Sequence, residues 1–206
     1  SVSPVNLTIF LLKNSAVIPI IGASAFEAQS GDVTTASEIF ISEKNKLLIL
    51  QTRSPITVAL LQNYIDEVIK FVEDEKLSEL IILTSSYSHE QHFIEKSPFE
   101  FIANSEIKKK VTDKSFSGFT EAAADFSVPG SGYAKKLFQQ ATEQNIPAVI
   151  FYKFVSEGDN FYDGVQLCQN VNMNLKVMPE VDGKAEIKIP ISWKFLFGRN
   201  VNTEIY

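Results

Sequence analysis

The sequence predicts a single α/β domain with a mostly parallel central sheet and helices on both sides of it. The run Ala148 to Tyr152, continued by Phe154, is apolar without polar alternation, which is typical of a strand buried on both faces of a parallel sheet. Segments with helical periodicity come before and after this run. The 206 residues, 45% of them hydrophobic, are enough for one well-packed core, and no linker composition divides them.

The N-terminal segment predicts a short helix, an edge strand and a loop. Ser3 and Pro4 precede an apolar segment and are typical of an N-cap and a first helical position, so we expect a helix that ends near Asn14. The run Val17 to Ile21 contains a proline, which places it at a sheet edge or strand end. The small, polar segment from Ser24 to Ser37 predicts a surface loop.

A hairpin and a helix should follow. Ile39 to Ser42 and Lys46 to Thr52 flank a short polar turn and predict two hairpin strands. A helix up to about Glu75 is predicted by apolar residues at helical spacing, namely Val58, Leu61, Ile65, Val68, Ile69 and Val72. Leu80 to Thr84 predicts a buried strand. The order from Leu47 to Leu83 therefore predicts a right-handed crossover within one parallel sheet.

The second half of the chain centres on the strand Ala148 to Phe154. Its pattern predicts a helix from Tyr133 to Gln144 before this strand and another from about Tyr162 to Leu175 after it. The polar segment from Pro179 to Lys188 is expected to be mobile. Residues 104–127 give no clear pattern, although Pro98 to Phe101 forms a short aromatic stretch.

Composition excludes several classes of partner. The net charge of -6 and a densest basic cluster of only three residues, Lys108 to Lys110, do not favour nucleic-acid binding. No apolar run reaches the roughly 18 residues of a membrane span, and no signal peptide is visible from Ser1 to Lys13. The single cysteine, Cys168, fits a reducing compartment, and its apolar helical position predicts a core residue.

Two groups of residues resemble catalytic motifs without matching them. His89 and His92 are three residues apart, whereas the zinc-protease helix needs two histidines four apart. We therefore expect surface histidines and no metal site. Ser85, Ser86 and Ser88 follow a strand, as a hydrolase nucleophile does, but the glycines of the nucleophile elbow are absent. A turn or helix cap explains these serines better.

Two further segments could bind a ligand at the end of a parallel sheet. The turn Gly130 to Gly132 precedes a helix and could hold a phosphate, although the P-loop spacing is missing. Glu157 and Asp159 lie in an acidic loop where α/β folds usually place ligands. No partner base accompanies them, and carboxylates that cap the next helix explain both. We therefore expect no catalytic residue and no cofactor.

Two segments are similar to the proteasome assembly chaperone family. The first is Lys153 to Asn160, whose loop residues are Ser156, Glu157, Gly158, Asp159 and Asn160. The second is Ile189 to Gly198, which includes Pro190, Trp193, Phe197 and Gly198. The segment Ile81 to His89, the following Ser97 to Phe99 and the turn at Gly130 to Gly132 also agree. The resemblance covers most of the chain in the expected order.

This resemblance implies a three-layer α/β/α Rossmann-like domain over residues 1–198 without enzymatic activity. Members pair with proteasome assembly chaperone 1. The heterodimer binds proteasome α-ring subunits, promotes formation of the α-ring, and blocks premature activator binding or ring pairing. The resemblance also implies a location in the cytoplasm and nucleus, and partners that include neither nucleic acid nor membrane.

The resemblance further implies a docking tail over residues 199–206. Family tails that end in a hydrophobic residue, a tyrosine and one further residue enter pockets between α subunits. The chain ends in Glu204, Ile205 and Tyr206. Ile205 matches the hydrophobic position of this motif and Tyr206 matches its tyrosine, whereas no residue matches the final position. Two alternatives remain open: a nucleoside hydrolase or phosphorylase that uses Gly130 to Gly132 for phosphate and Glu157 or Asp159 for the sugar, and a homodimeric scaffold.

Overall fold

The computed structural model describes residues 8–11, 14–23, 33–91, 97–110, 116–122, 128–187 and 189. The chain divides into two compact units, one formed by residues 1–57 and 187–206 and the other by residues 58–186. The sequence predicted a single domain over residues 1–198, and this boundary stays a prediction. Each unit is described by itself.

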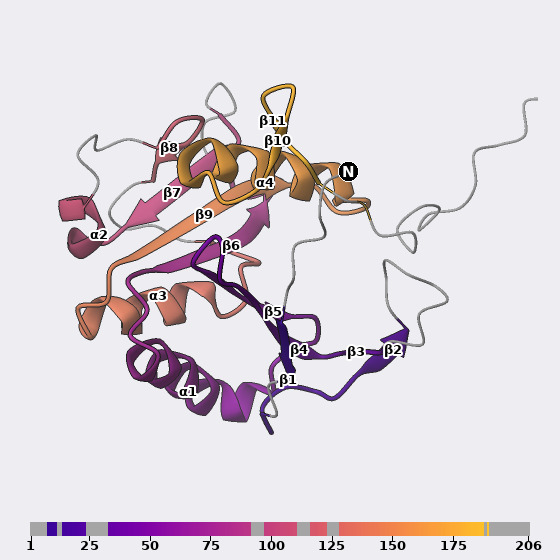
Figure 1. The fold of residues 1–206 in the computed structure, drawn as a ribbon, viewed down its shortest axis with the longest axis vertical. Coiled ribbons are helices and arrows are strands. Elements are labelled where there is room, and N and C mark those ends of the chain that lie inside the picture. The colour runs from indigo at the N-terminus through magenta and orange to yellow at the C-terminus, as the bar shows by residue number, and fades with distance from the viewer. Residues whose placement is uncertain are drawn as a thin grey trace, which may run out of the picture. The chain divides into compact units, whose positions relative to one another are not determined.

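The larger unit contains a four-stranded sheet in the order β6-β9-β7-β8 (Figure 1). Its strands are β6 (Leu80–Tyr87), β9 (Ala148–Val155), β7 (Phe99–Ala103) and β8 (Thr120–Glu121). β6 runs parallel to β9 and β7 runs parallel to β8, whereas β7 and β9 are antiparallel. The predicted central strand is thus confirmed, and so is a mixed α/β fold in which most strand pairs are parallel.

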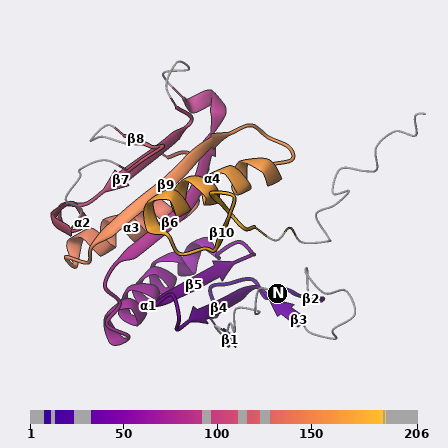
Figure 2. The same cartoon turned by 45° about the horizontal axis from the view of Figure 1, so that its top comes forward.

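Helices cover both faces of this sheet. α3 (Ala134–Glu143) contacts β6 and β9, and α1 (Leu61–Asp74) packs against α3 on the same side (Figures 1 and 2). α4 (Phe161–Leu175) and the short α2 (Ser105–Lys110) contact β9 on the opposite face. Short 3-10 turns occur at Val58–Leu60 (η1) and Ser88–Glu90 (η2). The three long helices were predicted within a few residues. Among the described residues no helix is long and apolar enough to cross a membrane.

Successive side chains of β9 point to opposite faces of the sheet, so its apolar residues contribute to two separate cores. Phe151 is 0% exposed, and its ring lies 4.8 Å from the Phe116 ring and 4.7 Å from the Phe119 ring. Leu167 and Val171 of α4 complete this core. On the other face Ile150 and Tyr152 are buried, as are Tyr64, Ile65, Leu137 and Phe138 of α1 and α3. A strand buried on both faces favours apolar residues on both, which is the pattern of Ala148 to Tyr152.

The segment after α4 is ordered by a buried asparagine, which corrects a prediction. Asn172 is 1% exposed; its amide donates to the Met178 carbonyl, and its side-chain oxygen accepts from the Met178 N–H at 2.7 Å. Here β10 (Glu180–Val181) and β11 (Lys184–Ala185) pair as a small antiparallel hairpin. The expectation of a mobile segment from Pro179 to Lys188 was therefore wrong for its described part, because a polar composition does not reveal side-chain hydrogen bonds of this kind.

The smaller unit contains two antiparallel sheets. β1 (Thr8–Leu11), β4 (Ser37–Ser42) and β5 (Leu47–Thr52) form a sheet in the order β1-β4-β5, which confirms the predicted hairpin. β2 (Ile21–Ala23) and β3 (Val33–Thr35) form a separate two-stranded ribbon. Val17 joins a single antiparallel bridge with Ile56.

Three predictions for the N-terminal half were wrong. Residues 8–11 form a strand instead of the end of a helix, because Thr8, Ile9 and Phe10 favour strands and β4 supplies a partner. The predicted loop from Ser24 to Ser37 contains β3 in its described part. β5 and β6 belong to different sheets, so they form no parallel crossover. Order along the chain does not identify a strand's partner, and β6 instead pairs with the distant β9.

Candidate functional site

A small pocket lies at the carboxyl ends of the parallel strands β6 and β9. Its volume is about 100 Å³, and it is lined by Ser85, Ser86, Tyr87, Gly130, Val155, Ser156, Glu157 and Asn160. Three segments singled out in the sequence thus meet here: the serines, the glycine turn and the acidic loop. The serines were predicted to follow the strand in a turn or cap, which holds for Ser88 of η2 but was wrong for Ser85 and Ser86, because β6 continues to Tyr87. Open α/β folds usually bind their ligands at the carboxyl ends of the parallel strands.

The glycine turn is tied to the end of β6 by hydrogen bonds and close packing. The Ser86 hydroxyl, 1% exposed, donates to the Pro129 carbonyl at 3.0 Å. Gly130 has φ +82°, and a Cβ at this position would lie 2.9 Å from the Tyr87 ring. Only glycine satisfies both the backbone conformation and this contact. The turn is thus built to pack against Tyr87, which leaves less room for a phosphate.

The acidic loop caps α4, as the sequence analysis expected. The Asp159 carboxylate accepts a hydrogen bond from the backbone N–H of Phe161, the first residue of α4, at 3.1 Å. Such a contact satisfies one of the free N–H groups at a helix start, where negative charge is also favoured. Ser156 joins the loop to η2 through a hydroxyl–hydroxyl contact of 3.1 Å with Ser88. The loop therefore forms a joint between β9, α4 and the end of β6.

The arrangement does not provide acid–base chemistry. Glu157 and Asp159 are both exposed, whereas paired catalytic carboxylates need different environments to separate their pKa values. The His89 side chain is 72% exposed and stacks on Tyr87 at 5.3 Å between ring centroids. His92 lies outside the described residues. Within the described part of the chain no three His, Cys, Asp or Glu residues could together hold a metal.

The pocket is also too small for a nucleoside, the substrate of the alternative hydrolase or phosphorylase function. Ligand pockets are usually about 300–1,000 Å³ in volume, several times larger than this one. Because Gly130 lies against the Tyr87 ring, deepening the pocket would require the glycine turn or this ring to move. The geometry therefore favours a contact surface over a substrate site.

One buried charge next to the pocket was not predicted. Lys153 of β9 is 7% exposed, and its Nζ forms an ion pair with Asp163 and donates to Gln166 at 2.6 Å, both residues of α4. Nζ also lies 5.2 Å from the centroid of the Phe99 ring. This lysine ties the central strand to α4 and so supports the acidic loop between them. The position of Lys153 within an otherwise apolar run was the feature of the sequence that could have predicted a buried ion pair.

The other predicted site residues lie outside the described residues. These are Pro190, Trp193, Phe197 and Gly198 of the second similar segment and Glu204, Ile205 and Tyr206 of the tail. Their assignments stay predictions.

Cys168 lies on α4 and is partly buried, and burial raises the pKa of its thiol. Only the thiolate is nucleophilic, so a raised pKa means less reactive sulfur near neutral pH. We expect iodoacetamide to modify Cys168 at least about tenfold more slowly than free cysteine, and the rate to rise with pH. Mass spectrometry of timed samples measures this, with the urea-unfolded chain as the control. Equal rates of Cys168 modification in the folded and the unfolded chain would contradict the burial of this thiol.

Comparison with known proteins identifies similar sequences and folds. No protein-family model matches the sequence. Proteasome assembly chaperone 2 of Mus musculus is 25% identical over 213 residues, which cover 92% of this chain and 81% of that protein. Its Homo sapiens counterpart is 23% identical over 229 residues, which cover 100% of this chain and 87% of that protein. The resemblance to the proteasome assembly chaperone family is thus confirmed.

Solved structures agree at the level of the fold. Pyrococcus furiosus PbaA, described as an archaeal homolog of proteasome-assembly chaperone, superposes with a TM-score of 0.62 at 12% identity, covering 82% of this chain and 70% of PbaA. A proteasome-assembly chaperone homologue from Mycobacterium tuberculosis gives a TM-score of 0.52 at 13% identity, covering 87% and 76%. These likenesses show a shared fold.

Proposed function

We propose that this chain is a non-enzymatic chaperone of proteasome assembly, the counterpart of proteasome assembly chaperone 2. The observation that carries this proposal is the similarity to curated proteins of that name over nearly the whole chain. The site supports it, because a small pocket with exposed carboxylates suits a contact surface better than catalysis.

The finer parts of the proposal come from the family. The chain forms a heterodimer with proteasome assembly chaperone 1, binds α-ring subunits, and blocks premature activator binding or ring pairing. It acts in the cytoplasm and nucleus. Its complete fold is the three-layer α/β/α Rossmann-like sandwich, for which the helices on both faces of the β6-β9-β7-β8 sheet are the supporting observation.

The proposed tail can contribute only part of the binding free energy. Burial of Ile205 and Tyr206 is worth about 3–6 kcal/mol before the tail is ordered, which leaves an affinity of roughly millimolar or weaker. A second anchor is needed. A partner subunit that also holds the ring raises the effective concentration of this tail at its pocket to about millimolar. This requirement favours action as a heterodimer.

Replacing both tail residues, Ile205→Ser with Tyr206→Ala, should weaken α-ring capture by about tenfold or more while the heterodimer still forms. The reason is that the apolar contacts in the pocket are lost but the second anchor remains. Native pull-down of α-ring intermediates with the co-expressed heterodimer measures the effect.

The matched control for this experiment is Val58→Ser, at an aliphatic side chain that is 86% exposed and lies outside the proposed tail. Unchanged ring capture by the double variant would refute the tail assignment. Failure of the unaltered heterodimer to capture any α-ring intermediate would refute the proposed function.

A further inference from the structure

The pocket at the carboxyl ends of β6 and β9 offers acceptor oxygens that other described residues leave free. Glu157 lines it and is exposed, and within the part of the chain that the structure describes its carboxylate forms no ion pair. Asn160, also in the lining, precedes α4 without a capping hydrogen bond from its side chain. The Ser156 hydroxyl contacts Ser88 at 3.1 Å and keeps a lone pair for a further donor. A ligand with several N–H donors would satisfy all three groups.

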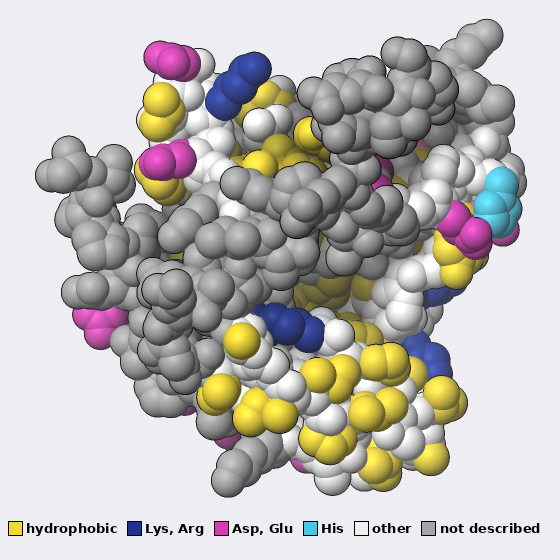
Figure 3. All heavy atoms as spheres, turned by 90° about the vertical axis from the view of Figure 1, so that its right-hand side faces the viewer, with side chains coloured by type: hydrophobic (Ala, Val, Ile, Leu, Met, Phe, Trp, Pro, Cys, Tyr) yellow, Lys and Arg dark blue, Asp and Glu magenta, His cyan; other side chains and the backbone are white. Residues whose placement is uncertain are grey.

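The charges around this pocket are negative in balance. Its lining segments and the described residues that adjoin them carry four carboxylates and three amines: Glu90, Glu157, Asp159 and Asp163 against Lys135, Lys136 and Lys153. Lys153 is already paired with Asp163. The adjoining residues 92–96 and 123–127, which lie outside the described part, add two carboxylates and one amine to this count. Acidic side chains also lie beside the histidine in the space-filling view (Figure 3).

One wall of the pocket is fixed before anything binds. The Tyr87 ring is stacked on His89 with 12° between the ring planes, and Gly130 lies so close that a Cβ there would be 2.9 Å from the ring. The Ser86 hydroxyl donates to the Pro129 carbonyl and so holds the glycine turn against β6. A preformed wall lowers the entropy lost when a ligand binds.

The size and lining of the pocket favour an organic cation. A volume of about 100 Å³ holds several water molecules, and so admits the head group of one side chain. Glu157 is the one Asp, Glu, His or Cys of the lining, whereas metal sites combine several such ligands. The start of α4 favours an anion, but the Asp159 carboxylate already accepts the Phe161 N–H there.

We propose that this pocket receives the guanidinium group of an arginine side chain from a protein that the chaperone contacts. This step rests on the function proposed above and names the chemistry of its contact. A guanidinium group carries five N–H donors in a planar fork and is more weakly hydrated than an ammonium group, so it suits a small pocket with a carboxylate at its rim. Two parallel N–H groups bind the Glu157 carboxylate, and the others reach Asn160 and Ser156.

The exposure of Glu157 limits the strength of this contact. Water and salt screen an exposed carboxylate, so the arginine adds at most about fivefold to the affinity for a partner. The pocket therefore contributes orientation and selectivity, and the larger part of the affinity comes from contacts elsewhere.

The first test does not depend on which protein supplies the arginine. N-acetylarginine amide is titrated to about 20 mM into the isotope-labelled full chain, and the backbone amide signals from Ser156 to Asn160 are followed by NMR. We expect these signals to shift with a millimolar dissociation constant. N-acetylcitrulline amide has nearly the same shape without the charge and should bind about threefold to fivefold more weakly. Glu157→Gln should remove the difference between the two probes.

The second test asks whether the arginine belongs to the α-ring. In the heterodimer co-expressed with proteasome assembly chaperone 1, Glu157→Lys should lower the yield of captured α-ring intermediates by about threefold to tenfold at low salt, and by less at high salt. The matched control is Glu143→Lys, the same charge change at an exposed residue of α3, which leads into the opposite end of β9. Melting curves that match the unaltered chain show that both variants are folded.

The outcomes separate this proposal from the proposed function. Equal binding of the arginine and citrulline probes, or shifts of the loop amides with inorganic phosphate alone, would overturn the cation site. Binding of the arginine probe together with unchanged α-ring capture by Glu157→Lys would overturn the α-ring as the source of the arginine. If the unaltered heterodimer captures no α-ring intermediate, the proposed function fails, while the titration with the arginine probe still decides whether the pocket binds a cation.

Discussion

Truncating Phe151 to alanine should lower the free energy of unfolding by about 3–5 kcal/mol. This ring is fully buried in the central strand and lies within 4.8 Å of the Phe116 and Phe119 rings, so its removal leaves a cavity that the two-sided sheet cannot collapse to fill. Urea-induced unfolding followed by circular dichroism measures the change.

The control for this experiment is Phe151→Leu, which keeps most of the apolar volume and should lose much less stability. A loss below about 1 kcal/mol for the alanine variant would mean that Phe151 is not the centre of this core. Equal losses for the two variants would mean that the shape of the ring contributes more than the cavity.

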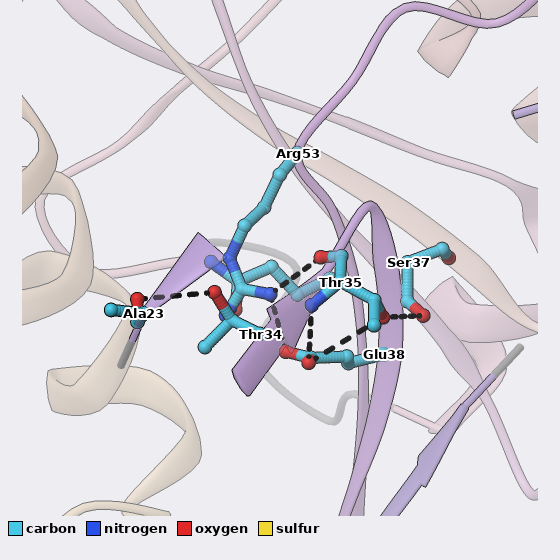
Figure 4. A network of polar contacts seen from close by, with 7 residues as sticks. Ala23, Thr34, Thr35, Ser37, Glu38 and Arg53 are labelled. Atoms are coloured by element: carbon cyan, nitrogen blue, oxygen red, sulfur yellow. Dashed lines mark hydrogen bonds and ion pairs between the residues drawn. The ribbon is translucent and has the colours of Figure 1, made fainter. Parts of the chain in front are cut away.

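Replacing Arg53 with methionine should cost about 1–3 kcal/mol, because the Glu38 side chain is 2% exposed and loses its cation, while the Arg53 side chain is 30% exposed and water partly screens the pair (Figure 4). Adding Glu38→Gln should recover much of this loss, since the double variant buries no unpaired charge. The same unfolding experiment measures both variants. Hydrogen exchange at the Gly22 and Thr34 amides should become faster in the single variant, because Thr35 is no longer held by Arg53.

An exposed ion pair provides the matched control. Lys70 and Asp74 pair across one turn of α1 with side chains 71% and 59% exposed, so Lys70→Met should leave the free energy of unfolding almost unchanged. If Arg53→Met lowers the free energy of unfolding as little as Lys70→Met does, the Glu38 carboxylate is hydrated in the folded protein. The Glu38–Arg53 ion pair would then not stabilise the end of β3.

The helices and strands that could be predicted from sequence are those in which the positions of the apolar residues follow directly from which face of the element is buried. α1, α3 and α4 repeat apolar residues at helical spacing, and the buried part of β9 is apolar except for Lys153, so local pattern and final environment agree. The capping role predicted for the acidic loop is confirmed for Asp159, which lies where a helix start favours negative charge, and stays a prediction for the exposed Glu157.

The elements that were missed depend on partners distant in sequence. β1 forms because β4 pairs with it, and the Ser3–Pro4 pattern at the start of the chain carries no information about that pairing. The β10–β11 hairpin depends on Asn172, and the link from β9 to α4 depends on the Lys153–Asp163 pair. In the last two cases a single polar side chain acts through contacts with specific partners, which leaves no period in the sequence.

The parallel pairing of β6 with β9 also governs when this protein can fold during synthesis. Leu80 pairs with Ala148, so β6 leaves the ribosome with neither its neighbour in the sheet nor the helix α4 that follows β9. Closing so long a loop is slow and leaves an unpaired strand edge exposed in the nascent chain. The sheet of this protein can therefore close only after β9, which ends at Val155, has been translated.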